Sequence, residues 1–373
     1  MELSLCMIVR NEARTLARCL ESVSGAVDEI VILDTGSTDE TKEIAGRYTD
    51  RVYDYVWQDD FSAARNASLA LGTKPYLLWL DADDMLERED RAKLIALKSR
   101  LDGSVDAVMT PYYYAFDDSG RPSFVFERER IIRADAGFRF EGAVHEAIAV
   151  GGRVLHEDVI VRHMRKGEEN HTARNLAIYE RQLAAGKPLS PRDRYYYARE
   201  LMAAERLREA EEAFGQYLQG SGSAENRMDA RMQRAECLRR LGKTDEAMRQ
   251  LLLALDDGCP RAETLCAIGA LCMGRDDEAA VFWYRAALLC GEPRTDSAFT
   301  QPAAYGYIPL MQLCVLYDRR GEHCEASRMN ERALLLRPDD PAALRNRAYF
   351  EALFDRERIR CGGGTTETER MEG

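Results

Sequence analysis

Two different patterns of apolar and polar residues divide the chain near residue 165. In the first part, short apolar runs alternate with segments whose apolar residues lie three or four positions apart. Runs of four to eight apolar residues are typical of buried strands, whereas the longer spacing is typical of amphipathic helices. This alternation predicts an α/β domain of βαβ units with a mainly parallel sheet.

The predicted elements of this first part begin with a strand, a helix over residues 13–23 and a second strand. Ser37, followed three residues later by Glu40, predicts a capping box at the start of the next helix. Another helix is predicted from Phe61 onward. The last three strands follow one another without regular helices between them, which predicts a mixed sheet on that side. The predicted strands cover residues 3–9, 29–33, 51–55, 76–80, 107–114, 124–133 and 159–163.

Beyond about residue 170 the strand signals vanish, and a helical period rich in Ala, Leu, Arg and Glu remains. Pairs of small residues seven positions apart recur there, each with another small residue twelve positions earlier. The copies are Ala235 with Ala247 and Ala254, Ala267 with Ala279 and Ala286, and Cys314 with Ala326 and Ala333. A weaker copy has Ala198 twelve positions before Ala210 and Tyr217 seven positions after it. Such spacing lets antiparallel helices pack closely and resembles tetratricopeptide repeats, with an ordinary helical bundle as the alternative. The long gap between Ala279 and Ala326 predicts an insertion.

These patterns predict three segments. An α/β domain is expected over residues 1–168, an all-α tetratricopeptide-like domain over 169–360, and a disordered tail over 361–373, where Gly, Thr and Glu predominate.

Composition narrows the functional classes. The chain of 373 residues has 52 basic and 64 acidic side chains, a net charge of −12, which argues against nucleic-acid binding. Its ten cysteines form no CxxC pair, which favours reduced thiols and a cytoplasmic location. No signal peptide and no integral membrane segment are predicted.

The chemistry is concentrated where the predicted strands end. The apolar run Tyr76–Leu80 stops at Asp81, Asp83 and Asp84. Crowded carboxylates repel one another unless a positive charge neutralises them, and hard divalent cations prefer oxygen ligands. A metal site is one interpretation of this pattern; a salt-bridged turn or a helix N-cap is the other.

Two more polar clusters follow predicted strands. Val9, Arg10, Asn11 and Glu12 follow the first strand, and the segment from Asp34 follows the second. Because the carboxyl ends of parallel strands meet at one edge of a sheet, these clusters and the carboxylates predict a nucleotide-sized crevice with a cation.

Four motifs occur in order along residues 1–165: LCMIVRNE at 5–12, ILDTGSTDET at 32–41, FSAARN at 61–66 and LDADD at 80–84. Together they resemble the family-two glycosyltransferases, which have the GT-A fold. With its helical repeats, the chain also resembles the bacterial subgroup that includes the sublancin-type peptide S-glycosyltransferases.

The resemblance implies an inverting hexosyl transfer from a nucleotide-sugar, usually a UDP-sugar, with Mg²⁺ or Mn²⁺. It places Asp34 at the base, Asp81 at the ribose, and Arg10 and Arg65 at the base or phosphates. The resemblance assigns the metal to Asp83, Asp84 and a late histidine, His163, with His156 as a competitor. The motif residues that would line the donor site are Val9, Arg10, Asn11, Glu12, Asp34, Arg65, Asn66, Asp81 and Ala82.

An inverting transferase also needs a base that accepts the proton of the acceptor. The segment 138–146 lies after the carboxylates, where the family has its base, and ends in His145-Glu146. In an extended segment these neighbours would point to opposite sides. Glu146 is the favoured base, and His145 is assigned to the acceptor or the metal; the two roles stay open.

The leading hypothesis is a soluble glycosyltransferase whose helical repeats hold a peptide acceptor, on Cys, Ser or Thr, or form a homodimer. A saccharide acceptor, as in envelope polysaccharide assembly, is the alternative within enzymes. A tetratricopeptide adaptor with a non-catalytic sugar-nucleotide domain is the alternative from another class.

Overall fold

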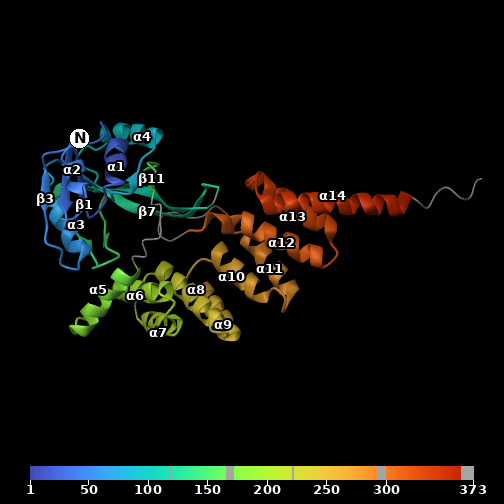
Figure 1. Ribbon diagram of the computed structural model, residues 1–373. Coiled ribbons are helices and arrows are strands. Elements are labelled where there is room, and N and C mark those ends of the chain that lie inside the picture. The colour runs from blue at the N-terminus through green and yellow to red at the C-terminus, as the bar shows by residue number, and fades with distance from the viewer. Residues whose placement is uncertain (118, 165–171, 221, 292–299, 363–373) are drawn as a thin grey trace, which may run out of the picture. The chain divides into compact units, whose positions relative to one another are not determined.

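The computed structural model describes residues 1–117, 119–164, 172–220, 222–291 and 300–362 (Figure 1). It divides into two compact units. The first contains Met1–Gln250 together with Thr300, and the second contains Leu251–Pro293 and the residues from Gln301 onward. The predicted tail covers residues 361–373; residues 361 and 362 instead end the last helix, and the rest of the predicted tail lies outside the described residues. The predicted boundary at residue 168 stays a prediction.

The first unit is built on one large sheet and a small hairpin. The strands of the large sheet are β1 (Leu3–Val9), β2 (Glu29–Asp34), β3 (Val52–Asp54), β4 (Tyr76–Trp79), β5 (Asp84–Met85), β6 (Ala107–Phe116), β7 (Pro122–Arg133), β10 (Val154–His156) and β11 (Val161–His163). Their order is β3-β2-β1-β4-β7-β6-β11-β5, with β10 beside β6. The pairs among β3, β2, β1 and β4 are parallel, whereas β7 is antiparallel to β4 and β6. The prediction of a sheet that is mixed on one side is therefore confirmed.

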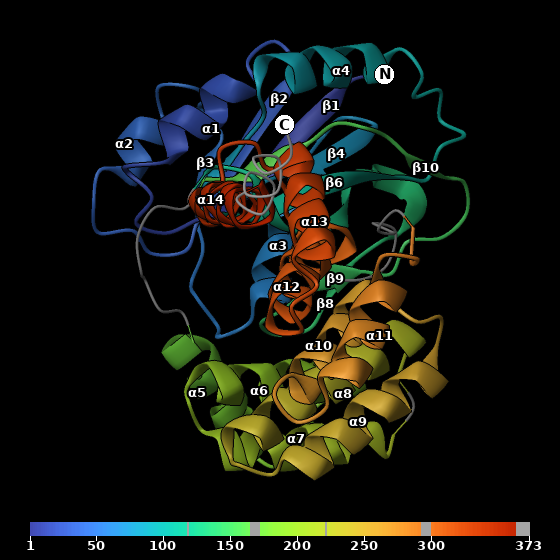
Figure 2. The same ribbon diagram turned by 90° about the vertical axis from the view of Figure 1, so that its right-hand side faces the viewer.

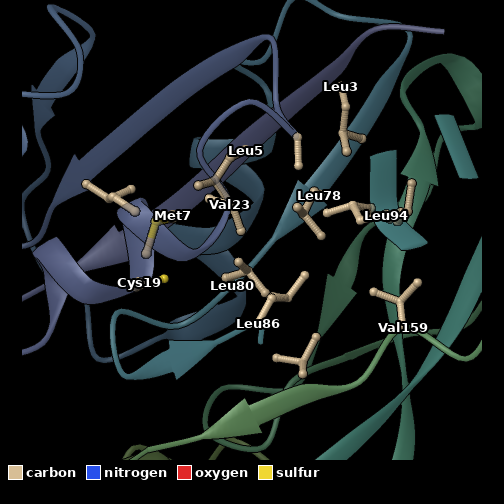
Figure 3. Packing of buried hydrophobic residues seen from close by; sticks show 14 of the residues in the cluster. Leu3, Leu5, Met7, Cys19, Val23, Leu78, Leu80, Leu86, Leu94 and Val159 are labelled. Carbon is tan, nitrogen blue, oxygen red and sulfur yellow. The ribbon is translucent and has the colours of Figure 1, made fainter. Parts of the chain in front are cut away.

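Helices cover both faces of this sheet. They are α1 (Leu16–Ser22), α2 (Thr41–Ala45), α3 (Phe61–Leu69) and α4 (Arg88–Lys98). Leu3, Leu5 and Met7 of β1 alternate along the strand and pack on one face with residues of α1 and α4 (Figure 3). Cys6, which points the other way, packs with Trp79 and with α3 residues. Because β1 is buried on both faces, its sequence is apolar at every position except Ser4, as in other central parallel strands.

Three details of the predicted elements are different in the structure. The capping box is wrong: α2 starts at Thr41, and no side chain caps it. Ser37 Oγ instead accepts from the Asn11 amide (2.9 Å), so it serves the neighbouring loop. The first helix starts at Leu16 rather than Ala13, and α4 was not predicted. The prediction of a helix from Phe61 is confirmed, and Asp60 caps it by accepting from the Ala63 amide.

Helices alone follow. They are α5 (Thr172–Ala184), α6 (Pro191–Ala203), α7 (Leu207–Leu218), α8 (Ala224–Arg240), α9 (Thr244–Asp257), α10 (Ala262–Cys272), α11 (Asp277–Ala287), α12 (Tyr307–Arg319), α13 (His323–Leu336) and α14 (Pro341–Gly362). Within each unit, successive helices pack as tetratricopeptide-like hairpins such as α6–α7 and α12–α13 (Figure 2). No helix of the described chain is long and apolar enough to cross a membrane.

The small residues of the repeat pattern lie where helices touch. Ala210, Ala247 and Ala326 are fully buried. In α11 the predicted register is wrong by one position: the buried pair is Ala280 and Ala287 rather than the preceding alanines. The sequence leaves the register of α11 ambiguous, because each repeat position offers two adjacent alanines: Ala279 and Ala280, then Ala286 and Ala287.

Close packing in the repeats makes a prediction at Gly269. A Cβ atom there would lie 3.0–3.1 Å from the ring of Tyr284 on α11. Gly269→Ala should therefore lower stability by about 1–3 kcal/mol, because overpacking outweighs the gain of about 1 kcal/mol in helix propensity. Thermal unfolding of the full chain measures this. Gly215→Ala in α7, which meets only the flexible end of Arg234, is the matched control and should melt at or above the wild-type temperature. A wild-type melting temperature for Gly269→Ala would contradict the prediction.

Candidate functional site

The polar clusters predicted at the strand ends do meet at one edge of the sheet. β1 lies between β2 and β4 and is parallel to both, so Val9, Asp34 and the residues after Trp79 share that edge. The Val9 carbonyl accepts from the Thr35 amide (2.9 Å), which joins the first two loops.

Asp34 has the most unusual environment of this edge. Its side chain is only 1% exposed. Oδ1 accepts from the amides of Gly36 (2.9 Å) and Ser37 (2.8 Å), but buried Oδ2 has no hydrogen-bond partner within the described chain. Gly36 has φ of +106°, which a residue with a Cβ rarely adopts. An unsatisfied buried acceptor is costly, so this oxygen is suited to an external N–H or O–H donor.

The loop after β1 is held against the loop after β2. Asn11 has φ of +56°, and its Oδ1 accepts from the Thr38 amide (2.8 Å). The Glu12 amide donates to Thr41 Oγ1 (2.7 Å). Arg10 is exposed, and its guanidinium has no hydrogen bond or ion pair to any residue that the structure describes. The loop is therefore ordered by its neighbours while one arginine is left available.

Arg65 joins two carboxylates in the interior. Its Nη2 lies 2.6 Å from Asp81 Oδ1 and its Nε lies 2.5 Å from Glu146 Oε1. Burial opposes ionisation of Asp81, but the arginines, Arg65 above all, hold the pKa of Asp81 well below its usual range. Burial likewise opposes the charge of Arg65, yet the two carboxylates raise its pKa. The arginine thus fixes the two carboxylates relative to each other.

Asn66 and Ala82, both predicted to line the donor site, contact other parts of the protein. The Asn66 amide donates to the Phe140 carbonyl (3.0 Å) and its Oδ1 accepts from the Phe140 amide (2.8 Å). Ala82 is buried in the apolar core. Asn66 therefore fixes the backbone of Phe140, and Ala82 contributes to the core.

Asp83, Asp84 and His163 form a cluster that could hold a metal ion. One potential ligand atom from each lies within 4.8 Å of the others. His163 reaches the cluster because β11 pairs antiparallel with β5, opposite Asp84. His163 Nδ1 lies 3.4 Å from Asp83 Oδ1. Two carboxylates and an imidazole suit a divalent cation.

The two carboxylates of this cluster differ. Asp84 is completely buried, and its Oδ2 lies 3.0 Å from Nη1 of Arg130, which is itself 1% exposed. Tyr112 donates to Asp84 Oδ1 (2.8 Å) and lies 2.9 Å from His163 Nδ1. Asp84 thus has fixed protein partners, whereas the ion pair of Asp83 in the described chain is with His163.

The pKa values of Asp83 and His163 are both raised. Burial raises the pKa of Asp83 to about 6, and the carboxylates of Asp81 and Asp84 add to the shift. Burial would lower the pKa of His163, but the nearby carboxylates raise it. A cation bound at Asp83 would remove the unfavourable charge that these shifts report.

Arg130 and Tyr112 were missed by the sequence analysis. The signal available was the run Glu127–Arg130 inside a predicted buried strand, since charged residues there require partners. Nothing in the sequence said which partners they find.

His145 and Glu146 lie on the turn of the small hairpin formed by β8 (Phe140–Glu141) and β9 (Ala147–Ile148). The expectation of an extended segment is wrong here, because Gly142, with φ of +103°, begins a turn. The neighbours nevertheless have different partners. Glu146 contacts Arg65, whereas His145 Nε2 lies 2.7 Å from Glu200 of α6. His145 is therefore absent from the Asp83–Asp84–His163 cluster, as is His156, whose Nδ1 lies 2.7 Å from Glu127.

Residues 4–155 match the family model described as glycosyl transferase family 2. This part of the chain is therefore similar to glycosyl transferase family 2. The match covers strands β1 to β10 and all the strand ends that form the candidate site except His163.

Three curated relatives are similar to this chain. A TPR repeat-containing protein of Synechococcus elongatus is 39% identical over 147 residues, which are 39% of this chain and 35% of that protein. The SPbeta prophage-derived glycosyltransferase SunS of Bacillus subtilis is 29% identical over 216 residues, 55% of this chain and 50% of SunS. The lipopolysaccharide core biosynthesis glycosyltransferase LpsC of Rhizobium meliloti is 31% identical over 160 residues, 41% and 58%. The chain thus spans 35% to 58% of the length of these relatives.

The raised pKa of Asp83 predicts that Asp83→Asn stabilises the metal-free protein. Above pH 6 the wild-type carboxylate is ionised in both states, and the folded state is disfavoured by the buried charge. The variant should gain up to about 3 kcal/mol at pH 7.5, and the gain should shrink as the pH falls toward 4, where the folded wild-type group is protonated. Thermal unfolding at both pH values measures it.

The same measurements with Mn²⁺ complete this test. Mn²⁺ should raise the melting temperature of the wild type but not of Asp83→Asn, because a ligand that binds the folded state stabilises it. Asp54→Asn, which removes an exposed carboxylate at the end of β3, should respond to Mn²⁺ like the wild type. An Mn²⁺ response retained by Asp83→Asn would remove Asp83 from the metal site.

Proposed function

We propose that the chain is an inverting, metal-dependent glycosyltransferase that uses a nucleotide-sugar donor, a UDP-sugar in particular. The observation that carries the proposal is that a buried acceptor without a partner and a potential metal-binding pair lie at the same sheet edge. One is the buried, unpartnered Oδ2 of Asp34 after β2, and the other is the Asp83–His163 pair beyond β4.

The spacing of these groups suits a nucleoside diphosphate. β1 separates β2 from β4, so the two strand ends lie roughly 10 Å apart, two strand spacings. Asp34 would accept a hydrogen bond from the imino N–H of the uracil ring, and Asp81 would accept one from a ribose hydroxyl. Arg10, exposed at the end of β1 between them, would contact the phosphates, which arginine binds with a matching fork of donors.

Asp83 and His163 would hold the cation, with Asp84 behind them. Mg²⁺ or Mn²⁺ supplies a positive charge that stabilises the diphosphate leaving group. The protein's own part is to keep Asp84 in place through Arg130 and Tyr112, so that its position does not depend on the ion. The sugar would then project from the diphosphate toward the hairpin that carries Glu146.

Glu146 is the proposed base. Its Oε1 is bound by Arg65, which also binds Asp81, so the carboxylate is fixed relative to the proposed ribose site. Inversion requires the acceptor to attack the sugar from the face opposite the leaving diphosphate, and a base on that side would take the acceptor's proton as the new bond forms.

A peptide acceptor, on Cys, Ser or Thr, is the proposed substrate of the tetratricopeptide-like helices, because stacked helix pairs make extended protein-binding surfaces. The similarity to LpsC, whose name concerns lipopolysaccharide core biosynthesis, favours a saccharide as the second candidate. A homodimer through the repeats stays a prediction from the sequence.

Donor use can be tested with the full chain, Mn²⁺ and individual UDP-sugars, by measuring UDP release and UDP binding. Asp34→Asn keeps an oxygen for the Gly36 and Ser37 amides but places an amide group or a neutral oxygen at the base. UDP affinity should fall about 10- to 100-fold, as expected for one hydrogen bond to a charged group. Asp54→Asn is the control and should bind UDP normally.

Absence of both metal-dependent UDP binding and donor hydrolysis would favour the adaptor alternative. Transfer to oligosaccharides but not to Cys- or Ser-containing peptides would decide for the saccharide acceptor.

Glu146→Gln tests the base. Glutamine can still accept from Arg65, so UDP binding should be unchanged, whereas transfer should slow by about 10²- to 10⁴-fold. Calorimetric UDP binding and single-turnover transfer measure the two effects separately. Transfer at the wild-type rate would exclude Glu146 as the base.

A further inference from the structure

The hairpin turn that carries Glu146 is attached to the helices as well as to the sheet domain. Both attachments lie within the compact unit Met1–Gln250. The Ala143 carbonyl accepts from the Phe61 amide (2.9 Å) at the start of α3. Ala143 and Val144 are buried in an apolar cluster formed mainly by α5, α6 and α7, with Tyr195 and Phe214 at its centre. The turn is therefore part of the core of the first helices.

His145 makes the specific contact to these helices. Its Nε2 lies 2.7 Å from Glu200 Oε1, and its ring stacks on Tyr196 with centroids 4.1 Å apart and planes at 18°. Arg192 Nε donates to the His145 carbonyl (2.9 Å). Side chain and backbone of one residue are thus held by three residues of a single helix, α6.

Glu200 is a buried carboxylate with hydrogen-bond contacts to His145 and Asn175. It is 6% exposed, and Asn175 of α5, also buried, donates to the same Oε1 (2.8 Å). A buried carboxylate without hydrogen-bond donors is strongly disfavoured, so Glu200 requires the donors that His145 and Asn175 supply. This requirement gives the contact a defined geometry, which apolar packing alone does not give.

The next residue along the turn faces the sheet domain. Glu146 contacts Arg65 through its side chain, and its carbonyl accepts from Arg128 Nη2 (3.1 Å). Two adjacent residues therefore link α6 to the Arg65–Asp81 pair. Rotation of the turn about its ends would move Glu146 and release His145 together.

We propose that Glu200 and Asn175 of the helical segment, acting through His145, are positioning residues that hold the β8–β9 turn so that Glu146 stays against Arg65. The inference rests on the proposed function for its kinetic consequence. His145 is then a mechanical contact of the turn rather than the base or a metal ligand. The first tetratricopeptide-like helices are correspondingly part of the catalytic unit.

The test compares removal of the contact with its conservative replacement. Glu200→Ala and His145→Ala should lower kcat about 10- to 100-fold with unchanged UDP affinity, because misplacement of a catalytic group by about 1 Å has effects of this size. His145→Gln, whose amide can donate to Glu200, should recover most of the lost rate. His145→Gln as slow as His145→Ala would overturn the proposal, since His145 would then act chemically.

A second measurement does not depend on turnover. Hydrogen exchange of the amides in residues 142–146 should be faster in Glu200→Ala and His145→Ala than in the wild type, and normal in His145→Gln. Unchanged protection in both alanine variants would overturn the proposal even if transfer had slowed. If the wild type transfers no sugar, the proposed function fails, and this exchange measurement still decides the positioning role.

Glu211→Ala is the matched control. It removes another carboxylate of the same helical segment, which pairs with Arg234 at 2.6 Å and does not touch the turn. Its kcat and its exchange over residues 142–146 should equal those of the wild type. A loss of kcat in Glu211→Ala equal to that in Glu200→Ala would mean that general destabilisation explains both, and would overturn the proposal.

Discussion

The neutralisation of three carboxylates crowded at one sheet edge is the constraint on which the site depends. A charge moved from water into a protein interior is disfavoured by several kcal/mol unless a partner compensates. Asp81 is compensated by Arg65 and Asp84 by Arg130, each across a distance of 3.0 Å or less. Asp83 has only His163 as its ion-pair partner in the described chain, and its pKa is raised to about 6. Two carboxylates are thus satisfied by arginines, whereas the third has an imidazole as its partner and a raised pKa.

Trp79 makes this arrangement of charges compact. The guanidinium groups of Arg65, Arg128 and Arg130 lie over its indole at 4.6, 4.6 and 4.0 Å from the centroid. The face of an aromatic ring attracts cations, which partly offsets the repulsion among three arginines and the loss of their hydration. The indole N–H donates to the Glu129 carbonyl (2.6 Å), so the ring itself is fixed. Trp79, the last residue of β4, therefore helps to hold Arg65 and Arg130 in place, and these arginines fix the carboxylates that follow the strand.

Helices α5 to α7 extend this network within the unit Met1–Gln250. Trp57 and Phe61 pack against the same apolar cluster as α5 to α7, and Val144 of the hairpin turn lies within it. A binding event on the first repeat would act on the same turn that contacts Arg65.

Local signals in the sequence determined the elements and the order of the motifs. Continuous apolar runs located β1, β2 and β4 to within a residue or two, because strands buried on both faces leave no other pattern. Parallel strand ends then implied that Asp34 and the carboxylates after Leu80 share an edge. The small-residue spacing likewise predicted the helical hairpins, although the adjacent alanines of α11 left its register ambiguous.

Only the tertiary structure decided which charges meet. Arg130 reaches Asp84 because β7 pairs antiparallel with β4, a pairing across about fifty residues that no local pattern encodes. Ser37 was predicted to cap a helix, but it accepts a hydrogen bond from the Asn11 amide because two loops converge at the strand ends. His145 finds Glu200 because a turn enters a helical core 55 residues further on. Propensity and periodicity act over a few residues, whereas the compensation of buried charge is settled by whichever partners the complete fold brings within about 3 Å.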